Sequence, residues 1–320
     1  MNDEYETYEE QETLPPPPRL WPKLLAALAF ALLLYYPVGM IWVHRIDADP
    51  DFSATAEDAP PGASRAVEIA AALIDREVNI NRWTANDPFF LPAAALDNMP
   101  NFQRGVVAAV SRFTIELTDQ IARTRGSSEV DTDLDKALGL LKYPGTVWIF
   151  DLSTSWVPTA SSEAQYRAAL RSLRRYNARL AEGNAMFERR ADNLIVVLDR
   201  IAADIGSSSA SLDRQIRERG GLFDFTADDL FYGVKGRLYA YYLILRELAF
   251  DFEKVLANRD LAPAWGRMLE SFRASVELEP WVVVNGPPDA ALLPSHLAGQ
   301  GFYLLRARTQ LREISNILLK

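Results

Sequence analysis

The 320-residue chain contains no cysteine and only two histidines, His44 and His296. Without cysteine the protein has no disulfide, no thiolate nucleophile, no iron–sulfur cluster and no cysteine-ligated zinc. Two histidines so far apart in the sequence do not indicate a histidine-ligated metal or a histidine relay. We therefore expect neither a metal nor a cofactor.

Positive charge is also scarce, with 34 Lys and Arg against 43 Asp and Glu and a net charge of −9 at pH 7. A protein that binds nucleic acid through its phosphates needs a basic surface, so this function is disfavoured. The sequence also lacks the glycine-rich phosphate-binding patterns and the G-x-S-x-G and S-x-x-K patterns of serine hydrolases. No nucleotide site or nucleophilic serine is predicted.

Long apolar runs are absent except for one, residues 24–43, which hold twenty consecutive residues without a charge. At 1.5 Å per residue such a helix is about 30 Å long, the thickness of the hydrocarbon core of a bilayer. Trp21 and Trp42 flank it at the positions that aromatic side chains prefer near lipid headgroups. A cleaved signal peptide is disfavoured because the run is too long and the preceding segment is acidic. The sequence predicts a transmembrane helix.

Charge around this run does not fix its orientation, because Arg19 and Lys23 before it are balanced by Arg45 and Arg65 after it. A short N-terminal tail before a first apolar segment favours a cytoplasmic N-terminus. Arginine outnumbers lysine 28 to 6, which we associate with a GC-rich bacterial genome. We expect a single-pass protein of the bacterial inner membrane whose C-terminal domain is periplasmic.

Composition divides the chain into four parts. Residues 1–23 form an acidic tail with a run of four prolines, and residues 24–43 form the transmembrane helix. Residues 44–63 are acidic and contain three prolines, as expected of a linker. The remaining residues, 64–320, are expected to form one extracytoplasmic domain.

Helical periodicity dominates the domain. Apolar residues recur at steps of three and four over 106–121, 231–255 and 304–318. Between Ser162 and Leu212 a heptad pattern predicts one long helix, with Asn177 and Asn184 as polar residues in its seam. The predicted fold class is all-α, a bundle of long antiparallel helices. The β-rich runs 146–150 and 281–284 are compatible with a small two-stranded accessory.

One stretch, residues 81–105, combines aromatic, amide and charged residues with prolines and is poorly helical in pattern. Long irregular loops in compact domains often carry function. The alternative is an aromatic loop that only caps the bundle. The candidate partner-binding residues in this stretch are Trp83, Asn86, Asp87, Phe89, Phe90, Asn98, Asn101 and Arg104.

Two groups of acidic residues have spacings that occur in functional sites. The first group has the alternating spacing that begins a calcium-binding loop: Asp131, Asp133 and Asp135. Such a loop needs glycine and glutamate at the positions that Lys136 and Lys142 occupy. The sequence therefore predicts the start of a helix here and not a calcium site. Asp228 and Asp229 open an aromatic helix and are the alternative site, in which two carboxyl groups act on a glycan. As first-turn residues such acids more often stabilise the helix dipole, and this interpretation is favoured.

Several runs carry a family resemblance: WTANDPFF, LDNMPNFQRG, YNARL, ADDLFYGVKG and PSHLAGQGFYLLRARTQLREI. With the single N-terminal span, they resemble a bacterial family of single-span envelope proteins catalogued only as a domain of unknown function. The likeness covers most of residues 20–320. It implies an inner-membrane anchor and a helical domain, and brings no catalytic residue or cofactor.

These observations leave three hypotheses. The first is a membrane-anchored scaffold or assembly factor of the cell envelope that binds another protein. The second is a carboxylate-based enzyme acting on cell-wall glycan through residues such as Asp228 and Asp229. The third is a helical sensor domain, which is weakened because 23 cytoplasmic residues are too few for an output domain.

Overall fold

A computed structural model describes residues 20–54, 60–124, 130–150, 156–218, 224–280, 282–287 and 294–320. The side chains of residues 120–124 and 225 are outside this description. Within it the regular structure is helical and no β-strand is formed, as the all-α prediction requires. The elements are α1 (Leu20–Val43), α2 (Arg65–Asp75), the π-helix η1 (Arg76–Ile80), the 3-10 helix η2 (Pro92–Ala95), α3 (Asn98–Thr124), α4 (Thr132–Leu141), α5 (Ser162–Ala181), α6 (Ala191–Glu218), α7 (Phe225–Asp251), α8 (Glu253–Asn258), α9 (Ala262–Val276) and α10 (His296–Leu318).

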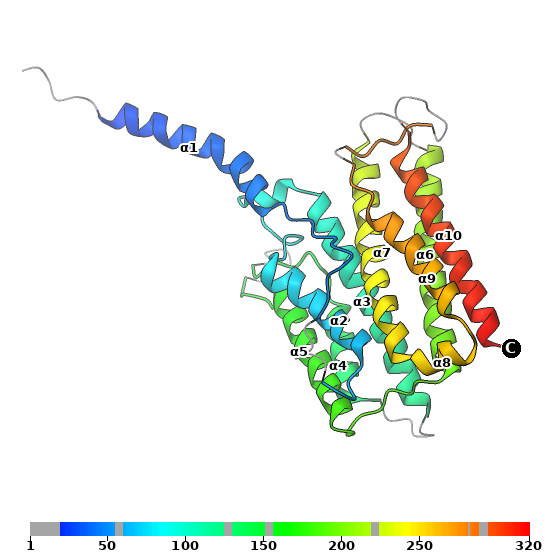
Figure 1. The fold of residues 1–320 in the computed structure, drawn as a ribbon. Helices are drawn as coiled ribbons and strands as arrows, with labels where there is room; N and C mark the ends of the chain where they lie inside the picture. Colours follow the sequence, from blue (N-terminus) through cyan, green and yellow to red (C-terminus); the bar gives the residue numbers. More distant parts are fainter. Residues whose placement is uncertain are drawn as a thin grey trace, which may run out of the picture.

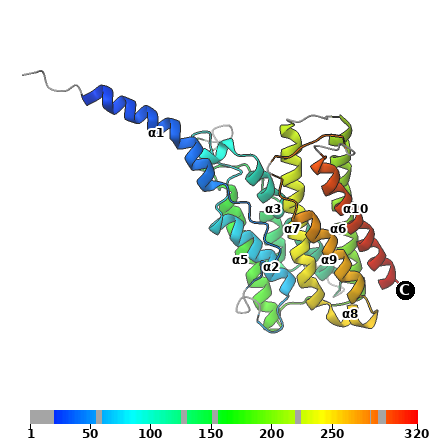
Figure 2. The ribbon, with the colours of Figure 1, turned by 45° about the horizontal axis from the view of Figure 1, so that its top comes forward.

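The apolar helix α1 projects from a helical bundle and has no buried residue, although its last turns contact η2 (Figure 1). The bundle is built around the pair α3 and α7. Helices α2, α4 and α5 pack on one side of this pair, and α6, α9 and α10 pack on the other (Figures 1 and 2). The core therefore runs through the whole bundle, with its middle between α3 and α7.

Glycine allows α3 and α7 to approach closely. A Cβ atom at Gly236 of α7 would overlap the backbone carbonyl of Phe102 in α3, and one at Gly105 of α3 would overlap the carbonyl of Gly233. Helix backbones come this near only where side chains are missing from the contact. These positions fix how the two central helices cross.

The long helix predicted between Ser162 and Leu212 is wrong, because α5 and α6 are separate helices in different halves of the bundle. Gly183 has a φ of 74°, and its backbone N–H donates to the carbonyl of Leu180 at 3.1 Å. This left-handed residue ends α5 as a glycine C-cap does. Asn177 is buried as expected of a seam residue, whereas Asn184 is exposed in the turn.

The other periodic segments form the predicted helices. The series from Phe231 lies in α7 and continues into α8, and the series from Leu304 lies in α10. Asp131 caps α4, because its carboxylate accepts the backbone N–H groups of Asp133 at 3.0 Å and Leu134 at 3.2 Å. The acidic motif is therefore a helix start.

The two β-rich runs do not form an accessory sheet in the described part of the chain. Residues 146–150 are irregular, and the N–H groups of Thr159 and Ser162 bond to the carbonyls of Ile149 and Val147 at 2.8 Å and 3.0 Å. Local loop contacts therefore take the place of a strand ladder here. Residues 282–287 are also not a strand, while residue 281 and most of the acidic tail lie outside the described residues.

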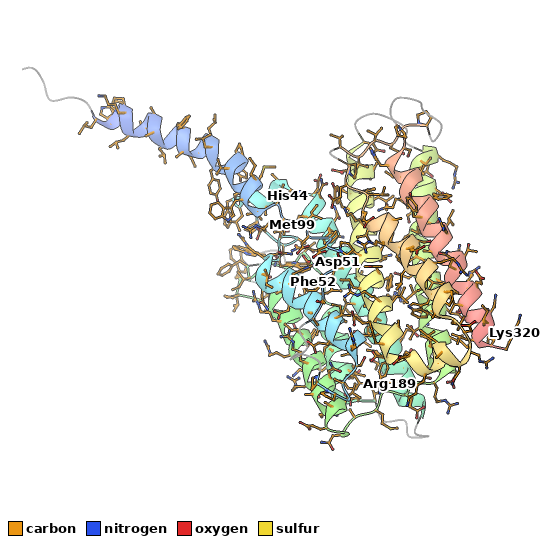
Figure 3. The ribbon with its side chains drawn as sticks, viewed as in Figure 1. His44, Asp51, Phe52, Met99, Arg189 and Lys320 are labelled. Atoms are coloured by element: carbon orange, nitrogen blue, oxygen red, sulfur yellow. The ribbon has the colours of Figure 1, made fainter. Side chains whose placement is uncertain are left out.

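The first part of the predicted linker, residues 46–54, lies along the bundle as a strap. Arg246 of α7 donates to the carbonyls of Pro50 at 2.8 Å and Phe52 at 2.6 Å, and Tyr239 donates to the carbonyl of Asp49 at 2.8 Å. Figure 3 shows His44 at the junction with α1, and Asp51 and Phe52 against the bundle. The strap joins the anchor helix firmly to the domain.

Candidate functional site

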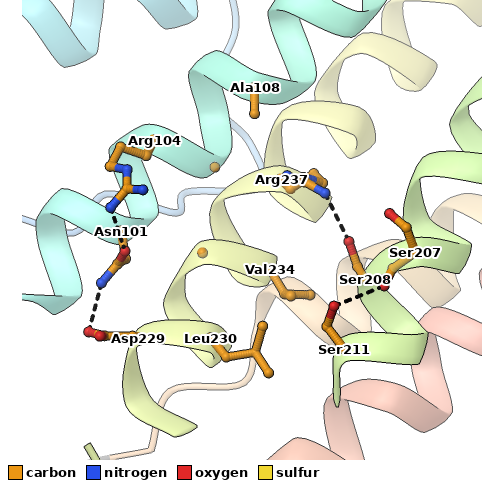
Figure 4. A pocket seen from close by; sticks show the side chains of 12 residues that line it. Asn101, Arg104, Ala108, Ser207, Ser208, Ser211, Asp229, Leu230, Val234 and Arg237 are labelled. Carbon is orange, nitrogen blue, oxygen red and sulfur yellow. Dashed lines mark hydrogen bonds between the residues drawn. The ribbon is translucent and has the colours of Figure 1, made fainter. Parts of the chain in front are cut away.

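A cleft of about 380 Å³ opens on the surface between α3, α6 and α7 (Figure 4). Most of its wall consists of short side chains, which leave room that larger residues would fill. Three charged side chains also line it. The lining residues are Asn101, Arg104, Gly105 and Ala108 of α3, Ser207, Ser208 and Ser211 of α6, and Asp229, Leu230, Gly233, Val234 and Arg237 of α7.

Arg237 is held in place at one end of the cleft. Its Nη1 donates to the hydroxyl of Ser208 at 3.1 Å, and its Nε lies 3.5 Å from a carboxylate oxygen of Asp204. The same oxygen of Asp204 accepts a hydrogen bond from the hydroxyl of buried Tyr241 at 2.7 Å. This chain of contacts fixes the guanidinium at the cleft wall.

Arg104 is the counterpart of Arg237 on α3. It is exposed and donates a long hydrogen bond, 3.3 Å, to the side-chain carbonyl of Asn101. The amide nitrogen of Asn101 donates to a carboxylate oxygen of Asp229 at 2.7 Å. Arg104, Asn101 and Asp229 therefore form a polar row along one edge of the cleft (Figure 4).

Beside this row, three carboxyl groups lie close together: Asp97, Asp228 and Asp229. Burial, together with the charges of Asp97 and Asp229, raises the pKa of Asp228 to about 6. With its amide nitrogen turned toward the acids, Asn98 donates to Asp228 at 2.5 Å and to Asp97 at 3.2 Å. Burial and Asp97 also raise the pKa of Asp229, while Arg104 and Asn101 lower it. Asp228 is thus a carboxyl group able to carry a proton near neutral pH.

The residues that the sequence suggested for a partner surface separate into three groups. Trp83 is 3% exposed and donates its indole N–H to the carbonyl of Gly145 at 2.8 Å. Asn86 is 6% exposed and donates to the carbonyl of Val147 and to Glu163. These two side chains hold the loop inside the domain, so they are not available to a partner.

The second group lies on the outside of the loop. Phe89 is 83% exposed and Phe90 is 47% exposed, and their rings contact each other. Asp87 differs from these two residues, because its side chain is only 5% exposed and pairs with Arg82 at 3.0 Å. The third group, Asn98, Asn101 and Arg104, lies in the first two turns of α3, so the irregular stretch ends at residue 97 and not at 105.

Asn98 and Asn101 of this third group lie against the two carboxyl groups of the alternative glycan-directed site. Asn98 and Asn101 contact Asp228 and Asp229, so two candidates that are more than a hundred residues apart in the sequence form one surface. Sequence reasoning did not place the serines of α6 or Arg237 at this surface. Gly206 and the serines after it resemble a turn, but they lie within α6. The sequence feature that could have indicated these serines is the helical spacing of small polar residues. The same spacing is common on helix faces that are simply exposed to water.

Within the described part of the chain, this surface has neither a metal site nor an activated nucleophile. Among the described residues no group of three or more His, Asp or Glu side chains is placed to hold a metal ion. The cleft serines are not paired with a histidine, since His44 follows α1 and His296 begins α10. The arrangement suits recognition of a polar group by hydrogen bonds and charge, with one carboxyl group available for proton transfer.

Comparison with known proteins identifies a family and no characterised relative. No curated protein and no solved structure matches the chain. The family model described as an uncharacterized protein conserved in bacteria, DUF2333, matches residues 20–220, which include α1 through α6 and end just before α7. The chain belongs to this bacterial family, DUF2333.

Proposed function

We propose that the protein is a membrane-anchored helical scaffold or assembly factor of the bacterial cell envelope, and that it binds a segment of another protein in the cleft between α3, α6 and α7. The observation that carries the proposal is the composition of this cleft. Short side chains make room, while Arg104, Arg237 and Asp229 supply both signs of charge.

The shape of the cleft favours a polypeptide over a small molecule. Pockets for small molecules usually enclose most of the ligand and are predominantly apolar. This cleft is open along the surface, and hydroxyl, guanidinium and carboxylate groups line it. A partner segment with an acidic side chain is suited to Arg104 and Arg237, and its backbone amides are suited to Asp229.

The anchor follows from α1. None of its 24 residues is buried, Lys23 is its only charged residue, and the helix is long and apolar enough to cross a membrane. A cleaved signal sequence is disfavoured because the last turns of α1 contact the domain: the hydroxyl of Tyr36 donates to the carbonyl of Phe89. We place the N-terminus in the cytoplasm and the bundle in the periplasm. A reporter that is active only in the periplasm, fused after Lys320, should be active; an inactive reporter would reverse the topology.

The binding proposal is tested by site-specific photocrosslinking in native membranes. Ser211 lines the cleft, and Thr309 on α10 is a matched control, because each is an exposed hydroxyl that donates to the carbonyl four residues earlier, at 3.2 Å and 3.0 Å. We expect a discrete protein adduct from a photoreactive residue at Ser211 and none from Thr309. Arg104→Glu should abolish the adduct without unfolding the chain. Equal labelling at both positions, or an adduct insensitive to Arg104→Glu, would contradict the proposal.

A second candidate is an enzyme that acts on cell-wall glycan. The observation in its favour is Asp228, whose pKa of about 6 matches that of a general acid beside a second carboxylate. Against it, only Asp229 lines the cleft, while Asp228 faces Asn98. If the purified chain releases reducing ends from peptidoglycan, and Asp228→Asn and Asp229→Asn abolish the release while the fold persists, the enzyme replaces the scaffold.

A further inference from the structure

An exposed aromatic patch lies beside the foot of the anchor helix. Ring contacts link its members in sequence: Phe89 to Phe90 at 5.6 Å, Phe90 to Trp148 at 5.7 Å and Trp148 to Phe150 at 5.5 Å between centroids. Trp156 is 87% exposed and lies three residues before Thr159, whose backbone N–H donates to the carbonyl of Ile149. We call Phe89, Phe90, Trp148, Ile149, Phe150 and Trp156 the aromatic patch. Contiguous exposed apolar side chains on a protein surface often mark a site of contact with a protein or a membrane.

The patch is continuous with α1. The hydroxyl of Tyr36 donates to the carbonyl of Phe89, and a Cβ atom at Gly39 would overlap the ring of Pro92. Further along, the backbone N–H of Arg45 contacts the sulfur of Met99 at 3.3 Å. Residues 89–99 therefore lie along the last two turns of α1 and the start of the strap, where Figure 3 places His44 and Met99 together.

This contact limits how far the hydrocarbon core can extend along α1. Irregular backbone exposed to lipid leaves polar groups unsatisfied, so the loop around Phe89 cannot enter the hydrocarbon core. The hydrocarbon must then end near Tyr36. Residues 20–36 rise about 25 Å, which is close to the minimum for a span. Trp21 then lies at one interface, and Tyr35 and Tyr36 lie at the other.

We propose that the aromatic patch lies in the headgroup layer of the membrane that α1 crosses and is covered by lipid. Residues 37–43 rise about 10 Å, so the end of α1 and the patch share this layer. Phenylalanine and tryptophan side chains are favoured there, because their apolar rings leave water while neighbouring polar groups remain hydrated. The patch gives the domain a second point of attachment and holds it against the bilayer. Phe89 and Phe90 are thereby assigned to lipid and not to a protein partner.

This inference rests on the proposal that α1 anchors the protein in a membrane. The test distinguishes failure of the anchor from failure of the lipid contact at the aromatic patch. The cysteine-free chain permits single-cysteine spin labelling of the full protein in vesicles of phosphatidylethanolamine and phosphatidylglycerol. Labels replace Leu28 in the span, Phe89 and Trp156 in the patch, and Phe302 on α10, which is 61% exposed and serves as the matched aromatic control. Accessibility to oxygen and to a water-soluble nickel chelate reports the depth of each label.

We expect the label at Leu28 to lie deep in the bilayer, the labels at Phe89 and Trp156 at headgroup depth, and the label at Phe302 in water. If Leu28 is deep but both patch labels are as accessible to nickel as Phe302, the patch proposal fails and the anchor stands. If Leu28 is also in water, both fail. A photoreactive residue at Phe89 should form adducts with lipid in native membranes; a protein adduct there would also overturn the proposal.

Discussion

The side-chain carbonyl of Asn177 accepts a hydrogen bond from the backbone N–H of Ser64 at 2.8 Å, which joins α5 to the start of α2. The amide nitrogen of Asn177 donates to Glu68 at 3.1 Å. Ser64 caps α2 and donates its hydroxyl to Asp251 at the end of α7, at 2.7 Å. One buried amide thus helps to fix the positions of three helices.

Replacing Asn177 with alanine should destabilise the domain. The change removes both hydrogen bonds and leaves the buried N–H of Ser64 without this acceptor, which costs roughly 1–3 kcal/mol. Asn184→Ala is the matched control, because Asn184 is exposed in the turn after α5 and its loss should change the free energy of unfolding by less than about 0.5 kcal/mol. Thermal unfolding in detergent measures both. Equal effects would show that the buried network is not stabilising.

Leu194 on α6 should also be essential for stability. Its side chain is fully buried, so Leu194→Ala should cost about 2–5 kcal/mol through lost burial and a cavity. Val196 on the same helix is 37% exposed, and Val196→Ala should cost much less. Denaturant unfolding in micelles compares the two variants. A loss at Leu194 no larger than that at Val196 would contradict the packing of α6 against its neighbours.

Much of the fold follows from local pattern. The buried faces of α7 and α10 recur every three or four residues, so the periodicity of series such as Leu304 to Leu318 is visible without the structure. The break between α5 and α6 is not visible in this way, because the heptad spacing continues by coincidence across the turn at Gly183. Only the left-handed backbone there reveals that the helix ends.

The candidate site is harder to predict because its parts are distant in the sequence. Asn101 and Asp229 each occur in segments that the sequence singled out, but nothing in their spacing shows that they are hydrogen-bonded. The exposed and buried members of residues 81–97 also look alike, since Trp83 and Phe89 are both aromatic. Burial depends on the position of Gly145 and its neighbours, which tertiary packing decides.

A single change should loosen the strap. Arg246→Ala removes the hydrogen bonds to the carbonyls of Pro50 and Phe52, and two such bonds are worth roughly 1–3 kcal/mol. Hydrogen exchange across residues 46–54 should then become about tenfold faster or more. Arg267→Ala on the exposed side of α9 is the control and should leave exchange in the strap unchanged. An unchanged strap in Arg246→Ala would mean that other contacts hold it.

Close helix approach at Gly236 gives another prediction. Gly236→Ala places a methyl group against the carbonyl of Phe102 and should force α3 and α7 apart, with a loss of at least about 1–3 kcal/mol. Gly139 in α4 has no atom within 4 Å of its Cβ position, so Gly139→Ala should stabilise the helix by up to about 1 kcal/mol. Opposite shifts in melting temperature are expected. A tolerated Gly236→Ala would contradict the close crossing of the central helices.

The acidic group at the cleft predicts a dependence of stability on pH. The pKa of Asp228 is about 6 in the folded protein, above its ordinary value of 3.8, because burial and the charges of Asp97 and Asp229 disfavour its ionised form. The stability that Asp228 contributes is complete below its ordinary pKa and is lost as pH rises through about 6. In Asp228→Asn the side chain is neutral at every pH, so the variant does not lose stability through ionisation at this position. The melting temperature of the variant, relative to the unchanged protein, should therefore rise between about pH 4 and pH 6.5 and then level off.

Asp199→Asn, on the exposed face of α6, is the control for this prediction and should show no such step. Both variants are compared with the unchanged chain in the same detergent over the same pH range, so that the titration of other groups cancels. A difference that falls with rising pH would mean that Asp228 is stabilised as a carboxylate in the folded protein. In that case a cation must face it in place of Asp97 and Asp229, and the charge pattern proposed for the cleft edge would be wrong.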